Sequence, residues 1–68
     1  MKLFYISAKV TLTVAGISGP FIKQSRYLVR EHNAVDAATK FTQQVRQDFA
    51  HMQYSTISFE YVEITSEI

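Results

Sequence analysis

Two histidines are the residues best suited to metal binding in this sequence, because it contains no cysteine. His32 and His51 stand at opposite ends of a predicted helix, too far apart to share one ion within a single chain. We therefore interpret both as surface histidines, with the helix C-terminus favouring the protonated form of His51. The sequence predicts neither a metal nor another cofactor.

Catalytic groups are not indicated by the spacing of the remaining polar residues. The serines are scattered, and none lies in a Gly-x-Ser-x-Gly turn. Glu60 and Glu63 are three residues apart on a predicted strand and so face opposite ways, and Glu67 follows in the tail. A chain of 68 residues is also small for an enclosed pocket. We predict that the protein is not an enzyme.

The segment Gly16–Pro20 holds both glycines and the only proline of the chain. A phosphate-binding loop would place such glycines between a strand and a helix. Here they link two predicted strands, which favours a hairpin connection.

Aromatic and basic side chains on one predicted sheet face form a stronger lead. Tyr5 and Lys9 would face outward on the first strand, and Arg26 and Arg30 on the second. Such groups can stack on bases and hold phosphates. Seven basic and six acidic residues leave a net charge of only +1, and Glu60 shares the face. A single-stranded nucleic-acid-binding module is therefore the alternative hypothesis.

Protein association is the favoured hypothesis. Tyrosine and arginine are enriched at interface hot spots, and an edge strand exposes backbone that another chain can extend. Tyr61, Val62 and Ile64 lie on the last predicted strand, where they would complete such an interface. A chain this short buries only about 60% of its unfolded surface, and small cores are often completed across a homodimer. Other apolar residues beyond the needs of the core are Leu3, Ile17 and Ile68.

A helix from Asn33 to about Met52 is the element best defined by its sequence. Asn33 is a favourable N-cap, and Asp36 can complete a capping box while its charge meets the positive helix end. Apolar residues then recur at steps of three and four, making one buried stripe. The stripe comprises Ala37 or Ala38, Phe41, Val45, Phe49 and Met52.

Strands are predicted on both sides of this helix. From Lys2 to Val14, apolar residues occupy every even position, which is typical of a strand with one buried face. For Phe21 to Glu31 the pattern is ambiguous, and we favour Tyr27 and Val29 inward, with Gln24, Arg26 and Arg30 outward. Lys23 and Ser25 would then point inward unless a bulge intervenes.

The last predicted strand runs from Ser55 to Ile64, after a short connection at 51–54. Ile57, Phe59 and Tyr61 alternate, but Val62 and Ile64 fall on the opposite parity. Either a bulge lies near Tyr61, or the end of the strand shows apolar side chains to the second face. Residues 65–68 are expected to be a frayed end.

These elements predict one α+β domain over residues 1–68 with the order β-β-α-β. A three-stranded antiparallel sheet of order 2-1-3 would carry the helix on one face, and its other face would be bare. Lys9 interrupts the first apolar run and no cleavage site follows, so we expect no signal peptide. No stretch is long enough to span a membrane, and we expect a cytoplasmic protein.

The functional hypothesis is thus a small non-enzymatic interaction module that forms a homodimer. A lone domain that starts at its own methionine would suit an accessory protein or inhibitor from a phage or mobile element. It would act by occupying a surface on a larger host protein. The layout itself recurs among unrelated small modules and does not imply a function.

Overall fold

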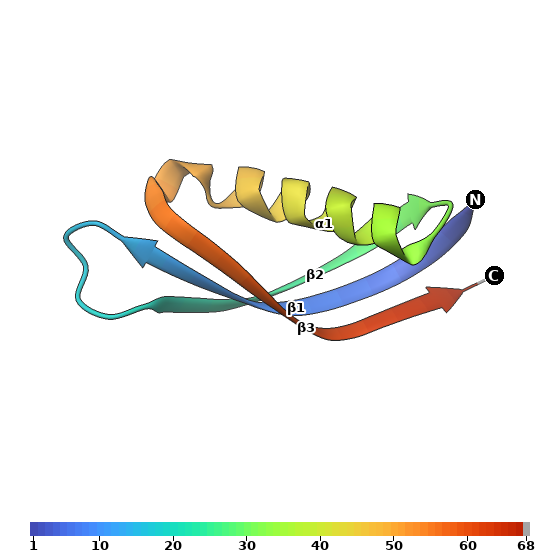
Figure 1. Cartoon of the computed structure of the whole chain (residues 1–68), viewed down its shortest axis with the longest axis horizontal. Helices are drawn as coiled ribbons and strands as arrows, with labels where there is room; N and C mark the ends of the chain where they lie inside the picture. Colours follow the sequence, from blue (N-terminus) through green and yellow to red (C-terminus); the bar gives the residue numbers. More distant parts are fainter. Residues whose placement is uncertain (68) are drawn as a thin grey trace.

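A computed structural model describes residues 1–67, the last of them by its backbone alone. Strand β1 spans Lys2–Val14 and strand β2 spans Phe21–Glu31. Helix α1 spans Ala34–Asp48, a 3-10 turn covers Ala50–Met52, and strand β3 spans Tyr54–Glu67. Helix α1 lies along one face of the sheet, and the opposite face is uncovered (Figure 1).

The predicted topology is confirmed. The strands form one antiparallel sheet in the order β2-β1-β3, so the most apolar strand is central. Its even residues from Phe4 to Leu12 are at most 4% exposed, because they meet the helix and have a strand on either side. Alternation of apolar and polar residues therefore directs one face of β1 into the core.

The register of β2 agrees with the favoured interpretation. Val29 lies opposite Phe4 and Tyr27 opposite Ile6, which places both on the helix-covered face. The pairing of β2 with β1 is continuous, so no bulge turns Lys23 and Ser25 away from the helix-covered face. Instead, Ser25 is half-buried and Lys23 reaches solvent from the sheet edge.

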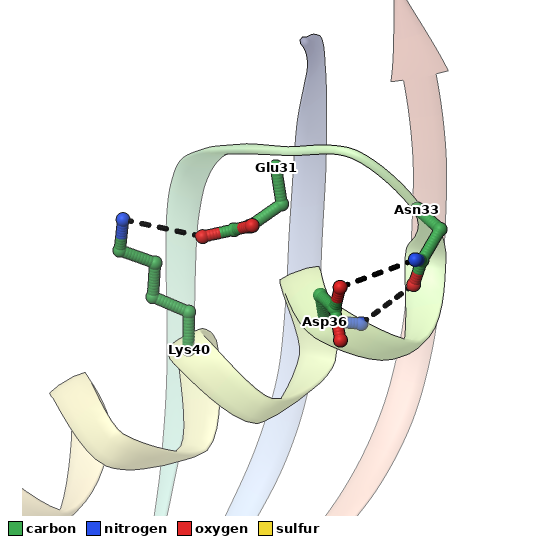
Figure 2. A network of polar contacts seen from close by, with 4 residues as sticks. All are labelled: Glu31, Asn33, Asp36 and Lys40. Carbon is green, nitrogen blue, oxygen red and sulfur yellow. Dashed lines mark hydrogen bonds and ion pairs between the residues drawn. The ribbon is translucent and has the colours of Figure 1, made fainter.

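Asn33 caps the start of α1, and Asp36 answers through the side-chain amide of Asn33 where a full capping box would use its backbone N–H. Oδ1 of Asn33 accepts a hydrogen bond from the Asp36 backbone N–H at 2.9 Å, and Nδ2 of Asn33 donates to Oδ2 of Asp36 at 3.1 Å (Figure 2). Lys40 and Glu31 form an ion pair of 3.4 Å beside it (Figure 2). The cap satisfies the Asp36 N–H, which lacks an intrahelical partner, and the ion pair fixes the helix to the end of β2.

The end of α1 lies earlier than predicted. The α-helix ends at Asp48, and the chain continues through the 3-10 turn to Gln53, which has φ of 52°. This left-handed residue reverses the chain into β3. Phe49 and Met52 still pack against the core, because the turn keeps them on the side facing the sheet.

Strand β3 contains the bulge that was one of the two predicted alternatives. Tyr61 lies opposite Ala8, but Glu63 lies opposite Ser7, so Val62 is the extra residue. Beyond it, Ile64 lies opposite Ile6 and returns to the helix side. The predicted frayed end is wrong for residues 65–67, because they continue the ladder with β1; residue 68 lies outside the described residues.

An aromatic cluster joins α1 to both outer strands. Phe41 is fully buried at its centre, with ring centroids 6.1 Å from Tyr27 of β2. On the other side it lies 6.4 Å from Phe59 and 6.0 Å from Tyr61, both in β3. Arg46 places its guanidinium 6.0 Å from the Phe59 ring centroid. These contacts seat the helix across the sheet.

The loop from Ala15 to Pro20 joins β1 and β2, as the hairpin interpretation requires. Gly16 and Gly19 have φ of 83° and 82°, a region that other residues adopt only with strain. The two glycines therefore permit the chain reversal.

Candidate interaction surfaces

The open sheet face carries the four residues expected on it. Tyr5 and Lys9 occupy odd positions of β1, whose even positions face the helix. Arg26 lies opposite Ser7 and Arg30 opposite Leu3, so both arginines share that face. The register thus places the aromatic residue and the three basic residues on one side of the sheet.

A polar network ties part of this face together. Nε2 of Gln24 donates to Oγ of Ser7 at 3.1 Å, and Nη2 of Arg26 donates to Oε1 of Gln24 at 3.4 Å. Ser7 is only 3% exposed, although it lies on the side away from the helix. Gln24 covers Ser7 and orients Arg26, so this arginine is held in place over the sheet.

The charges of the open face are divided between its two edges. Strand β2 contributes Arg26 and Arg30 on one side. Strand β3 contributes Glu60, opposite Lys9, and Glu63, opposite Ser7, on the other. The prediction that these two glutamates face opposite ways is wrong, because the bulge at Val62 returns Glu63 to the face of Glu60. Lys9, on the central strand, pairs with Glu60 at 3.1 Å, and Glu63 accepts a hydrogen bond from Oγ1 of Thr65 at 2.7 Å. The face therefore has a cationic edge and an acidic edge.

Two aliphatic residues on the open face were missed as candidates from the sequence. Leu28 is 65% exposed opposite Tyr5, and Ile22 is 55% exposed opposite Thr11. The signal that could have found them is their parity, which they share with Arg26. Together with Tyr5 they give the face an apolar component that a solvated surface does not need.

The other three candidates lie at the β3 edge. Tyr61 and Ile64 face the helix side and are each 40% exposed, because α1 does not cover this strand fully. Partial burial raises the pKa of the Tyr61 hydroxyl above its usual value. Val62 at the bulge is 65% exposed. The seven predicted residues are therefore split between two surfaces, the open face and the β3 edge.

Two shallow depressions lie beside the helix. One of about 160 Å³ is lined by Tyr27, Val29 and Lys40 among others. The other, of about 300 Å³, is lined by polar residues at the helix start, including Glu31 and Lys40, which pair with each other. Both are at or below the lower end of the size range of ligand pockets.

Among the side chains that the structure describes, no three of His, Asp or Glu come close enough to hold a metal ion. His32 precedes the helix cap and His51 lies in the 3-10 turn, so the two stay at opposite ends of α1. None of the described helices has the length and apolar character needed to cross a membrane.

Comparison with known proteins gives no relative: no family model, no curated protein and no solved structure matches this chain.

Proposed function

We propose that this chain is a non-enzymatic protein-interaction module whose first partner is a second copy of itself. The observation that carries the proposal is the number of large apolar side chains left in solvent by so small a fold. Those on the two candidate surfaces are 40–65% exposed: Ile22, Leu28, Tyr61, Val62 and Ile64. Tyr61, Val62 and Ile64 lie close together on β3, and Leu28 lies beside Tyr5 on the open face; small apolar groups of this kind occur at protein interfaces.

Self-association would add to a core of limited size. Among the described residues, the buried apolar core consists of only nine side chains, two of which are alanines. Burying a fully exposed aliphatic side chain contributes about 1.5–3 kcal/mol, and roughly half of this remains to be gained at side chains that are 40–65% exposed. Covering even two of them across an interface would therefore favour the dimer.

The β3 edge suits a second, larger partner. It is the outer strand of the sheet over 14 residues, and its outward backbone groups can accept an added strand. Tyr61 and Ile64 would then lie beside that strand on the helix side. In this proposal the dimer acts as an accessory protein or inhibitor by occupying a surface on a larger protein.

Binding of single-stranded nucleic acid is the alternative function. It is favoured by the presence of Tyr5, Arg26 and Arg30 on one open sheet face. It is disfavoured by two carboxylates on the same face. Glu60 forms an ion pair with Lys9 and neutralises its charge, and Glu63 lies on the same strand as Glu60. Repulsion of phosphates by these groups would offset much of the attraction.

Light scattering during size exclusion separates the two functions. We expect a mass of twice 7.8 kDa, little changed between low and high salt and unaffected by a short mixed-sequence oligonucleotide. A monomer that shifts with the oligonucleotide only at low salt would contradict the interaction module and support the alternative.

A further inference from the structure

We infer that two copies pack their open sheet faces against each other about a two-fold axis parallel to β1. This inference rests on the proposed self-association and specifies its geometry. The reasoning starts from the separation of charge on the open face. Arg26 and Arg30 lie along β2, whereas Glu60 and Glu63 lie along β3, on opposite sides of the central strand.

Symmetry decides how these edges can meet. In the aligned class of face-to-face packing, two sheets keep their strands within about 30° of each other, and the two-fold axis then runs either along the strands or across them. An axis across the strands places β2 on β2 and β3 on β3, which sets like charges against each other. An axis along β1 places the β2 of each copy over the β3 of the other, and opposite charges then meet twice.

Pairing through sheet edges does not give this match. Strand β3 contains three glutamates and no basic residue, so an antiparallel β3–β3 pair gathers carboxylates. Strand β2 contains three basic residues and one glutamate, so a β2–β2 pair gathers cations. A β2–β3 pair has matching charges but joins copies head to tail, which leads to open-ended assembly.

The register predicts which residues meet. Rotation about an axis along β1 keeps each residue at its level along the strands. Arg26 and Glu63 share the level of Ser7, so Arg26 lies over the partner's Glu63. Arg26 is already oriented by Gln24, and Glu63 by Thr65, which reduces the entropy lost on pairing.

The remaining residues of the face are compatible with this packing. Lys9 lies near the axis, where it approaches the partner's Lys9, but each is neutralised by its own Glu60 at 3.1 Å. Tyr5 and Leu28, at one level, supply apolar contact on both sides of the axis. Both chains thereby bury side chains that the monomer leaves partly or largely exposed.

The face is also large enough for a stable dimer. The width of the face is roughly 14 Å, because its three strands are spaced about 4.8 Å apart. Its length is roughly 36 Å, because β1 and β2 pair over 11 positions at about 3.3 Å each. The projected area is therefore about 500 Å². The relief of the side chains raises the accessible area above this flat value, towards the roughly 800 Å² per partner of a standard interface.

Charge reversal on one strand tests the inference. Arg26→Glu sets two pairs of carboxylates against each other and should raise the dimer dissociation constant by about 10- to 100-fold in sedimentation equilibrium. Lys23→Glu is the matched control, because it makes the same charge change on the other face of β2 and should leave the constant unchanged. The double variant Arg26→Glu/Glu63→Arg restores opposite charges and should restore the dimer.

Each result bears on a definite claim. A wild-type monomer would overturn both the proposed self-association and this geometry. A wild-type dimer that Arg26→Glu weakens no more than Lys23→Glu would overturn the geometry alone. Val62→Asp, at the β3 edge, should leave the dimer intact. If this variant dissociates the dimer, the open-face geometry is overturned and the interface lies at the β3 edge. Circular dichroism of every variant checks that the fold is kept.

Discussion

Phe41 is the side chain whose replacement reports most directly on the aromatic cluster that seats the helix. It is fully buried and contacts the rings of Tyr27, Phe59 and Tyr61. Truncating a buried phenylalanine to alanine costs about 3–5 kcal/mol. A chain of 68 residues is stable by about 3–10 kcal/mol, so Phe41→Ala would unfold much of the population.

Phe41→Leu keeps most of the volume and leaves a measurable folded state. It removes three ring contacts, each worth about 0.5–1.5 kcal/mol, and leucine recovers part of the loss by packing. We expect the free energy of unfolding to fall by about 1.5–3 kcal/mol. Urea unfolding followed by circular dichroism, at one protein concentration, measures this value. Gln43→Ala, on the solvent face of the same helix, is the control and should change stability little.

A loss below about 0.5 kcal/mol in Phe41→Leu would refute the reasoning, because surface substitutions produce changes of that size. The helix would then be held mainly by contacts other than this cluster.

Three further predictions concern polar contacts. Asn33→Ala should lower the free energy of unfolding by about 1 kcal/mol through loss of the cap, and Asn33→Asp should retain most of it; equal losses would contradict the capping role. The hydrogen bond to Asp48, with burial and the charge of that carboxylate, raises the pKa of Tyr27 above 10.0. The stability that this hydrogen bond contributes is present below about pH 10 and is lost as the pH rises through the raised pKa. The urea midpoint of Tyr27→Phe should therefore decline less steeply at alkaline pH than that of the wild type. An unchanged slope would contradict this role of the hydrogen bond. The side chains of the Lys9–Glu60 ion pair are 50% and 70% exposed, and exposed ion pairs contribute little to stability. At a protein concentration low enough to keep the chain monomeric, Glu60→Gln should change the free energy of urea unfolding by less than about 0.5 kcal/mol. A larger loss would show that the pair stabilises the fold.

The sequence was most informative where a single local rule governs the structure. Alternation in β1 predicted its buried face, since even positions of a strand between two others must meet the helix. Asn33 and Asp36 predicted the helix start, because this cap depends only on residues three apart. The strand order followed from these elements and from short antiparallel connections.

Features that depend on distant residues were less accessible. The pattern around Val62 allowed either a bulge or a two-sided strand, and only the pairing with Ser7 and Ala8 decides between them. The helix was predicted too long because Phe49 and Met52 continue the apolar spacing in a 3-10 turn. Residues 65–67 were expected to fray because their pairing with β1 is long-range.

The candidate surfaces were predicted only in part for the same reason. Arg26 and Arg30 could be assigned to the open face once a register was chosen for β2. Leu28 shares the parity of Arg26 and so belongs to the face that was predicted to be bare, but attention to charged and aromatic residues left it out. The division of charge between β2 and β3 required the strand order and both registers, and no motif reports it.

The most direct test of the account mixes two single variants, each of which is expected to dimerise about 10- to 100-fold more weakly than the wild type when alone. Arg26→Glu opposes carboxylates to carboxylates in its own dimer, and Glu63→Arg opposes cations to cations. In the mixed pair, both contacts join opposite charges, so at a concentration where each variant alone is mainly monomeric, light scattering should show a heterodimer of twice the 7.8 kDa chain mass. A mixture that stays monomeric, or variants that dimerise equally well alone, would contradict association through the open sheet face.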